Sequence, residues 1–137
     1  MNLRLPITLA LTASLVVAMN GCGKGKIDQC NALIGKMNSS AETLTKGPQP
    51  TDDTSTKTYA EGMKKVATEV SSVELEDAKL KELRDQYVKM YNDVGGALLT
   101  IVNAPGEPKP EDVAKASAAT KEADKLTESI NTYCGGK

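Results

Sequence analysis

Beyond residue 26, apolar residues recur at alternating spacings of three and four, with polar residues between them. This period places the apolar side chains on one face of an α-helix, and it predicts a first helix over residues 27–46. The apolar stripe of this helix is Ile27, Cys30, Ile34, Met37, Ala41 and Leu44. The residues expected to face water are Asp28, Lys36, Ser40 and Lys46.

Prolines mark the loops between four such segments. Because proline costs about 3 kcal/mol in a helix interior, the cluster of Pro48 and Pro50 and the cluster of Pro105, Pro108 and Pro110 should lie at loops. The second helix is predicted to follow candidate caps at residues 52–55 and to end at a tight turn near residues 71–74. The third is predicted from about residue 75 to 102, and the fourth from residue 110 to the glycines at 135 and 136.

Composition supports the same fold class. Alanine, lysine, glutamate, leucine, threonine and valine dominate the chain, and these residues favour helix more than sheet. The length after residue 26 suits one domain. Four helices joined by short or moderate loops favour an up-down-up-down bundle. We therefore predict an all-α, four-helix bundle over residues 27–137.

A different pattern occupies the first 21 residues. One cation, Arg4, precedes a mostly apolar or hydroxylic run over residues 5–17, and small residues follow. This order is typical of a secretory signal peptide. A transmembrane helix needs roughly 20 apolar residues, whereas this run is shorter and has Pro6 at its start. We expect residues 1–21 to be removed as a signal peptide.

Two processing routes are compatible with the end of this segment. Val16-Val17-Ala18 fits the small-x-small pattern of an ordinary signal peptidase. Cleavage there would release a soluble secreted or periplasmic protein that begins at Met19.

The second route rests on Met19-Asn20-Gly21-Cys22, which resembles the lipobox of bacterial lipoproteins. Gly21 and Cys22 match that motif, whereas the two residues before them differ from its usual Leu and Ala or Ser. The chain thus resembles the small helical lipoproteins of unassigned function, in its N-terminus alone. This resemblance implies a lipidated Cys22, with residues 22–26 as a flexible tether to the membrane. Since Gly23 rather than aspartate follows the cysteine, it also implies sorting to the outer membrane, with the domain facing the periplasm.

The number of cysteines favours the lipoprotein route. The chain has three, and an odd thiol is unusual in an exported protein. If Cys22 carries lipid, Cys30 and Cys134 remain to pair. The start of the first helix and the end of the fourth meet at one end of an up-down-up-down bundle, so the predicted topology agrees with a Cys30–Cys134 disulfide. No Cys-x-x-Cys motif is present, which favours a structural bridge over a redox role.

The absence of histidine excludes the most common kinds of reaction centre. Without it the chain cannot form Ser-His-Asp or Cys-His nucleophile systems, nor a Glu-x-x-His di-iron site or an ordinary catalytic zinc site. Acidic and basic residues nearly cancel, with a net charge of −1, so no basic field attracts nucleic acid. We expect no catalytic residue, no metal, no cofactor and no nucleic-acid partner. Carboxylate pairs at the predicted helix starts, Glu74 with Glu76 and Glu111 with Asp112, are better explained as helix caps.

One place in the predicted bundle is a candidate ligand-binding gap. Gly95 and Gly96 lie inside the third helix, where each should cost about 1 kcal/mol relative to alanine. They indicate either a kink or close helix crossing, which we favour, or a gap lined by Tyr87 and Tyr91. Tyr87 lies on the apolar stripe itself, so we expect it to pack in the core.

These observations lead to ranked hypotheses for function. The first is a non-enzymatic, lipid-anchored protein of the cell envelope that serves as an interaction or structural module, with another envelope protein as its partner. The second is a binding module for a small apolar or lipidic ligand between the helices. The third, an enzyme that uses only carboxylates and tyrosine, is remote.

Overall fold

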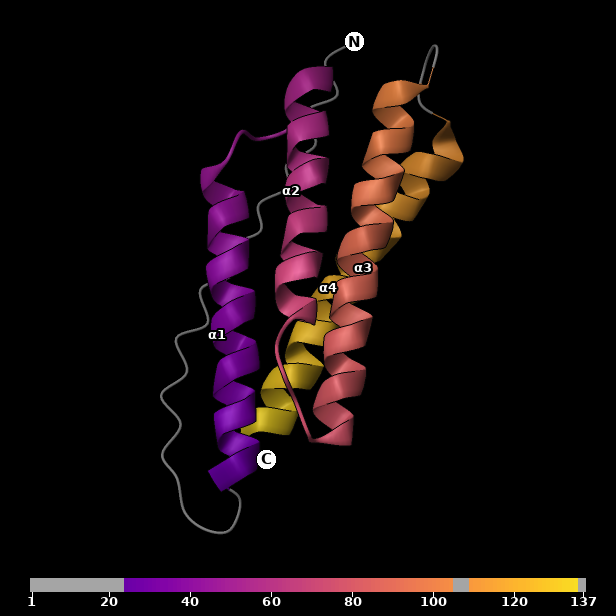
Figure 1. Cartoon of the computed structure of the whole chain (residues 1–137). Coiled ribbons are helices and arrows are strands. Elements are labelled where there is room, and N and C mark those ends of the chain that lie inside the picture. The colour runs from indigo at the N-terminus through magenta and orange to yellow at the C-terminus, as the bar shows by residue number, and fades with distance from the viewer. Residues whose placement is uncertain (1–23, 105–108, 136–137) are drawn as a thin grey trace.

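The computed structural model describes residues 24–104 and 109–135, which form four α-helices. They are α1 (Lys24–Lys46), α2 (Asp53–Ser71), α3 (Ala78–Asn103) and α4 (Pro110–Gly135). Successive helices run in opposite directions (Figure 1). The prediction of an all-α, up-down-up-down four-helix bundle is confirmed. The predicted signal peptide, residues 1–21, and the predicted lipidation site Cys22 lie outside the described residues.

The pair α2 and α3 forms the centre of the bundle. These two helices share the most extensive contact, while α4 packs mainly on α3 and α1 packs mainly on α2. α1 touches α3 and α4 at only a few points. The core is aliphatic apart from buried tyrosines, and its largest fully buried apolar side chains are Tyr87, Leu33, Leu80, Ile130 and Val70.

The first helix begins earlier than predicted. The sequence predicts a flexible tether over residues 22–26, but α1 starts at Lys24. The ammonium group of Lys26 lies 3.8 Å from the centroid of the Tyr133 ring in α4. A cation over an aromatic face is attracted by the negative charge of that face. This contact between α1 and α4 gives the first turn of α1 a partner that the sequence pattern does not reveal.

Two residues of α1 face the core against the prediction. Ser40 was expected to face water, but it is only 2% exposed. Its hydroxyl donates a hydrogen bond of 2.8 Å to the carboxylate of Glu69 in α2, and Lys36 lies 3.5 Å from the same carboxylate. Leu33 is fully buried although it lies outside the predicted stripe, whereas Ile34 is only partly buried. The core face of α1 is therefore rotated toward Leu33 and Ser40.

The third helix begins three residues later than the predicted start at about residue 75. The side chain of Gln29 in α1 accepts hydrogen bonds from the backbone N–H groups of Glu76 and Asp77, at 2.6 and 2.9 Å. Asp77 then caps α3, because its carboxylate accepts from the N–H of Leu80 at 2.9 Å. The segment before α3 is therefore held by α1, and Leu75 within it packs into the core.

A disulfide joins Cys30 in α1 to Cys134 in the last turn of α4, as predicted. The two Cα atoms are 5.7 Å apart, within the usual range for disulfides. The bridge connects residues 104 positions apart in the sequence. Since α1 and α4 otherwise touch at few points, this bond closes the bundle.

Removing the bridge should destabilise the bundle strongly. For a loop of this length, the chain-entropy account gives a loss of about 4–5 kcal/mol in the free energy of unfolding. We expect the double variant Cys30→Ala/Cys134→Ala to show that loss in denaturant unfolding followed by circular dichroism. A reductant should bring the wild-type midpoint down to that of the variant and leave the variant unchanged. A wild-type midpoint that stays constant while both thiols become titratable would contradict this role.

Candidate functional site

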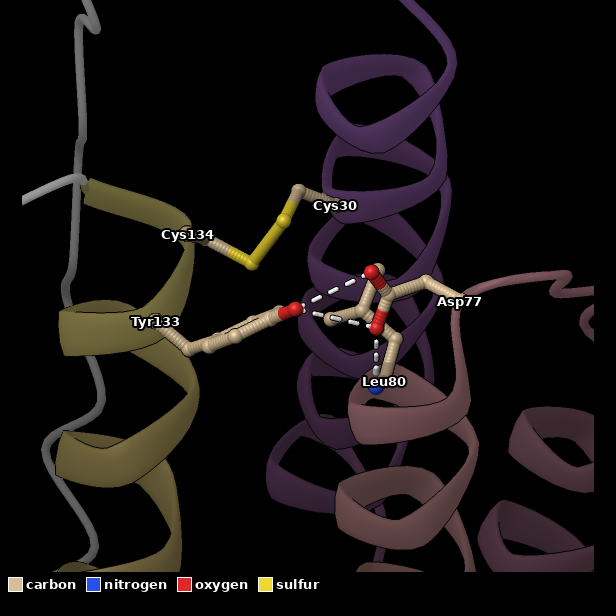
Figure 2. Close-up of a disulfide and its surroundings, with 5 residues drawn as sticks. All are labelled: Cys30, Asp77, Leu80, Tyr133 and Cys134. Atoms are coloured by element: carbon tan, nitrogen blue, oxygen red, sulfur yellow. Dashed lines mark hydrogen bonds between the residues drawn. A yellow bond between two sulfur atoms is a disulfide. The ribbon is translucent and has the colours of Figure 1, made fainter. Parts of the chain in front are cut away.

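The end of the bundle that carries the disulfide gathers polar side chains from three helices. Cys30 is buried in α1, and Cys134 lies beside it at the end of α4. Figure 2 shows the hydroxyl of Tyr133 directed at the carboxylate of Asp77, next to the bridge. That hydroxyl lies 3.1 and 3.0 Å from the two carboxylate oxygens. We call Gln29, Asp77 and Tyr133 the clamp, because they tie α1 and α4 to the start of α3.

Electrostatics favour a charged Asp77 within the clamp. The N–H of Leu80 donates to its carboxylate, and the Tyr133 hydroxyl and the nearby Lys26 add to this effect, so the pKa of Asp77 is lowered from its ordinary value of 3.8. The hydrogen bond from the Tyr133 hydroxyl to Asp77 raises the pKa of Tyr133, because the carboxylate stabilises the protonated phenol. The clamp thus pairs an ionised acid with a neutral phenol.

A cleft of about 650 Å³ lies beside the clamp. Three of its lining residues are cations, one from each of α1, α3 and α4, and we call it the lysine cleft. Lys79 also pairs with Glu82 in its own helix, at 2.8 Å. The complete lining is Lys26, Lys79, Lys125, Glu128, Ser129, Thr132 and Tyr133.

The glycines that suggested a ligand gap lie elsewhere, in the contact between α2 and α3. A Cβ atom on Gly95 would lie 2.9 Å from the carbonyl oxygen of Ala60 and 3.3 Å from Cγ of Lys64. Gly95 therefore makes the close helix crossing that the sequence favours. A Cβ atom on Gly96 meets no atom within 4 Å, so this position does not need glycine for space.

The two tyrosines proposed to line that gap are core residues. Tyr87 is 2% exposed and Tyr91 is 5% exposed, and their ring centroids lie 4.7 Å apart. Burial raises the pKa of both phenols, because it disfavours the charged form. Core packing is thus the structural role of Tyr87, as predicted.

A smaller groove of about 170 Å³ lies between α1 and α2. Gly62 shapes it, since a Cβ atom there would lie 2.8 Å from Cδ1 of Leu44. The hydroxyl of Ser40 and the nearby Lys36 lower the pKa of Glu69 at its edge. The lining is Ser40, Thr43, Leu44, Gly47, Pro48, Thr58, Tyr59, Gly62, Lys65, Val66 and Glu69.

Residues 24–104 and 109–135 contain no group of three acidic or cysteine side chains close enough to hold a metal ion. In the same ranges, no helix is both long and apolar enough to cross a membrane. The carboxylates of Glu74, Glu76 and Glu111 are exposed, and Asp112 is half-buried in the first turn of α4.

Sequence reasoning missed the clamp and the lysine cleft. Asp77 stands near the predicted start of the third helix, where a capping residue is expected, and its position there is the one usable signal. The partners Gln29 and Tyr133 have no such signal, because they lie 48 and 56 positions from Asp77 in the sequence. The lysines of the cleft belong to three different helices and converge only in the folded chain.

Alanine at the two glycines should have opposite effects on stability. Gly95→Ala places a methyl group against the backbone of α2, and overpacking of this kind costs typically 1–3 kcal/mol. Gly96→Ala meets open space and gains up to about 1 kcal/mol from helix propensity. Thermal or denaturant unfolding of the two variants checks this prediction. Equal effects would show that Gly95 does not form a close crossing.

Acid should weaken the bundle partly through Asp77. The pKa of Asp77 is lower in the folded state than in the unfolded state. Its contribution to the free energy of unfolding is therefore complete above the unfolded-state pKa, and it is lost as the pH falls through the folded-state pKa. Asp77→Asn keeps a capping side chain, so we expect it to reduce the loss of unfolding free energy below about pH 4. Asp28→Asn, at an exposed position of α1, is the matched control. Identical acid profiles for wild type and Asp77→Asn would contradict this assignment.

Comparison of the chain with protein-family models, with curated proteins and with solved structures finds no match.

Proposed function

We propose that the chain is a non-enzymatic lipoprotein of the bacterial cell envelope. It is exported, acylated at Cys22 and anchored in the outer membrane with its bundle facing the periplasm. There it acts as an interaction or structural module that presents helical surfaces to another envelope protein.

The distribution of the cysteines carries this proposal. The Cys30–Cys134 bridge accounts for two of the three cysteines. The third, Cys22, stands in the segment that resembles a lipobox. Disulfides persist in oxidising compartments such as the periplasm, which supports export. Acylation of Cys22 would leave the mature protein without a free thiol.

The environments of the acidic side chains support a function without catalysis. None of the acidic residues in the described ranges is buried, and Glu69, Asp77 and Asp112 are half-buried. Glu69 accepts a hydrogen bond from Ser40 and Asp77 accepts one from Tyr133, while Asp112 pairs with the exposed Lys115 in its own helix. A carboxylate enzyme needs two acids whose environments separate their pKa values within one cleft. The lysine cleft contains a single carboxylate, that of Glu128.

A second function has one specific support. The groove between α1 and α2 is lined mainly by apolar surface, and its volume of about 170 Å³ suits a small apolar ligand or the end of an acyl chain. This groove lies on the opposite side of α2 from the crossing at Gly95 that first suggested a ligand gap.

The chemical state of the N-terminus tests the main proposal. We expect mass spectrometry of protein purified from envelopes to find Cys22 as the first residue, with a diacylglycerol group on its sulfur and an acyl chain on its amino group. Cys22→Ser should abolish both modifications and release the protein from the detergent phase in a detergent partition assay. Cys30→Ala/Cys134→Ala should keep the lipid. An unmodified chain that begins at Met19 would refute the proposal.

A further inference from the structure

The start of α1 sets how far the bundle can stand from the membrane. On the proposed function, the acyl chains leave the protein at Cys22, and α1 begins two residues later at Lys24. Two residues span at most about 7 Å. The headgroup layer on each side of a bilayer is roughly 5–8 Å thick. An acylated Cys22 therefore holds the disulfide end of the bundle at the surface of the headgroups.

The lysine cleft lies at this same end. Lys26 belongs to the first turn of α1, Lys79 to the first turn of α3 and Lys125 to the last three turns of α4. The lining contains one carboxylate, that of Glu128, and three cations, of which Lys79 also pairs with Glu82 in its own helix. Asp77, next to the lining, is a second carboxylate, and its oxygens accept hydrogen bonds from the N–H of Leu80 and the hydroxyl of Tyr133.

The clamp orients one of these cations. Asp77 fixes the hydroxyl of Tyr133, and the ring of Tyr133 holds the ammonium group of Lys26 at 3.8 Å. Ordering Lys26 in the folded protein reduces the entropy that a ligand would have to remove. The lining of the cleft thus has more cations than carboxylates, and one of these cations is ordered before a ligand binds.

We propose that the lysine cleft binds the phosphate of an anionic phospholipid headgroup in the membrane that anchors the chain. Lysine ammonium groups bind phosphate as point charges. Thr132, an exposed residue of the lining, provides a further hydroxyl donor for a phosphate oxygen. The cleft is shallow and open to solvent, so a headgroup can reach its lining without entering an enclosed cavity. Binding fixes the orientation of the bundle on the membrane.

The test uses the mature acylated protein in vesicles. An amine-reactive reagent labels the lysines, and mass spectrometry measures the labelling rate of each one. The rates are compared between vesicles of phosphatidylcholine alone and vesicles in which about one third of the lipid is phosphatidylglycerol. We expect the labelling rate of Lys26 to fall about fivefold on the anionic vesicles. The attraction of one lysine to an anionic membrane surface corresponds to a factor of about this size. Lys57, in the first turns of α2 at the other end of the bundle, should not change.

Two double variants separate binding in the cleft from simple proximity to the membrane. Lys79→Gln/Lys125→Gln removes two cleft cations and should abolish the protection of Lys26. Lys81→Gln/Lys121→Gln removes the same amount of charge from exposed positions of the same two helices. In this variant Lys26 should still be protected. Equal protection of Lys26 in both variants, or no protection in the wild type, overturns the proposal. Protection by inorganic phosphate on phosphatidylcholine vesicles, as strong as by anionic lipid, also overturns it, because the occupant is then free phosphate.

The failure of the anchor and the failure of the cleft are distinguishable. If mass spectrometry finds no lipid on Cys22, the proposed function fails, and the same anionic vesicles are added to the unacylated protein. Protection of Lys26 that depends on Lys79 and Lys125 then still supports the cleft as a headgroup site. The absence of protection under those conditions overturns it.

Discussion

A single covalent bond joins the two helices of this bundle that have little noncovalent contact. α1 and α4 touch at only a few points, yet Cys30 and Cys134 tie them across 104 positions of the sequence. Without that bond, α1 would remain attached mainly through α2, and α4 mainly through α3. The central pair α2 and α3 would then carry two flanking helices that could separate independently. The disulfide therefore joins the two flanking helices, α1 and α4, and closes the bundle around the central pair.

The polar clamp extends the effect of the bridge to α3. Gln29 is the residue before Cys30, and Tyr133 is the residue before Cys134, so the bridge places both clamp residues beside the start of α3. Gln29 satisfies the backbone N–H groups of Glu76 and Asp77, while Tyr133 binds the side chain of Asp77. Backbone N–H groups at a helix start have no partner within the helix, and the side chain of Gln29 supplies one from α1. The sulfur bridge and the hydrogen bonds thus constrain the same three helices.

Much of this architecture could be predicted because it depends on local pattern. The four helices follow from the apolar period and the proline clusters, and the bridge at Cys30 follows from the topology that this period implies. The errors arise where a distant residue changes the local preference. Ser40 is polar and yet buried, because Glu69 accepts its hydroxyl hydrogen bond from another helix. α3 starts late because Gln29 binds the preceding backbone. The lysine cleft depends on three helices meeting, which no single stretch of sequence encodes.

In α3 and α4, packing weakens with distance from the cross-linked end. In α3 the buried residues end at Gly95, and the following turns, although rich in aliphatic residues, are only partly buried. In α4 the buried apolar residues among the described side chains are Leu126 and Ile130, both in its second half. Local opening costs least where few apolar side chains are buried. The disulfide, the clamp and the Lys26–Tyr133 contact all lie at the opposite end, where α1 begins. In α3 and α4, the described residues are therefore most tightly constrained at the end that carries the disulfide.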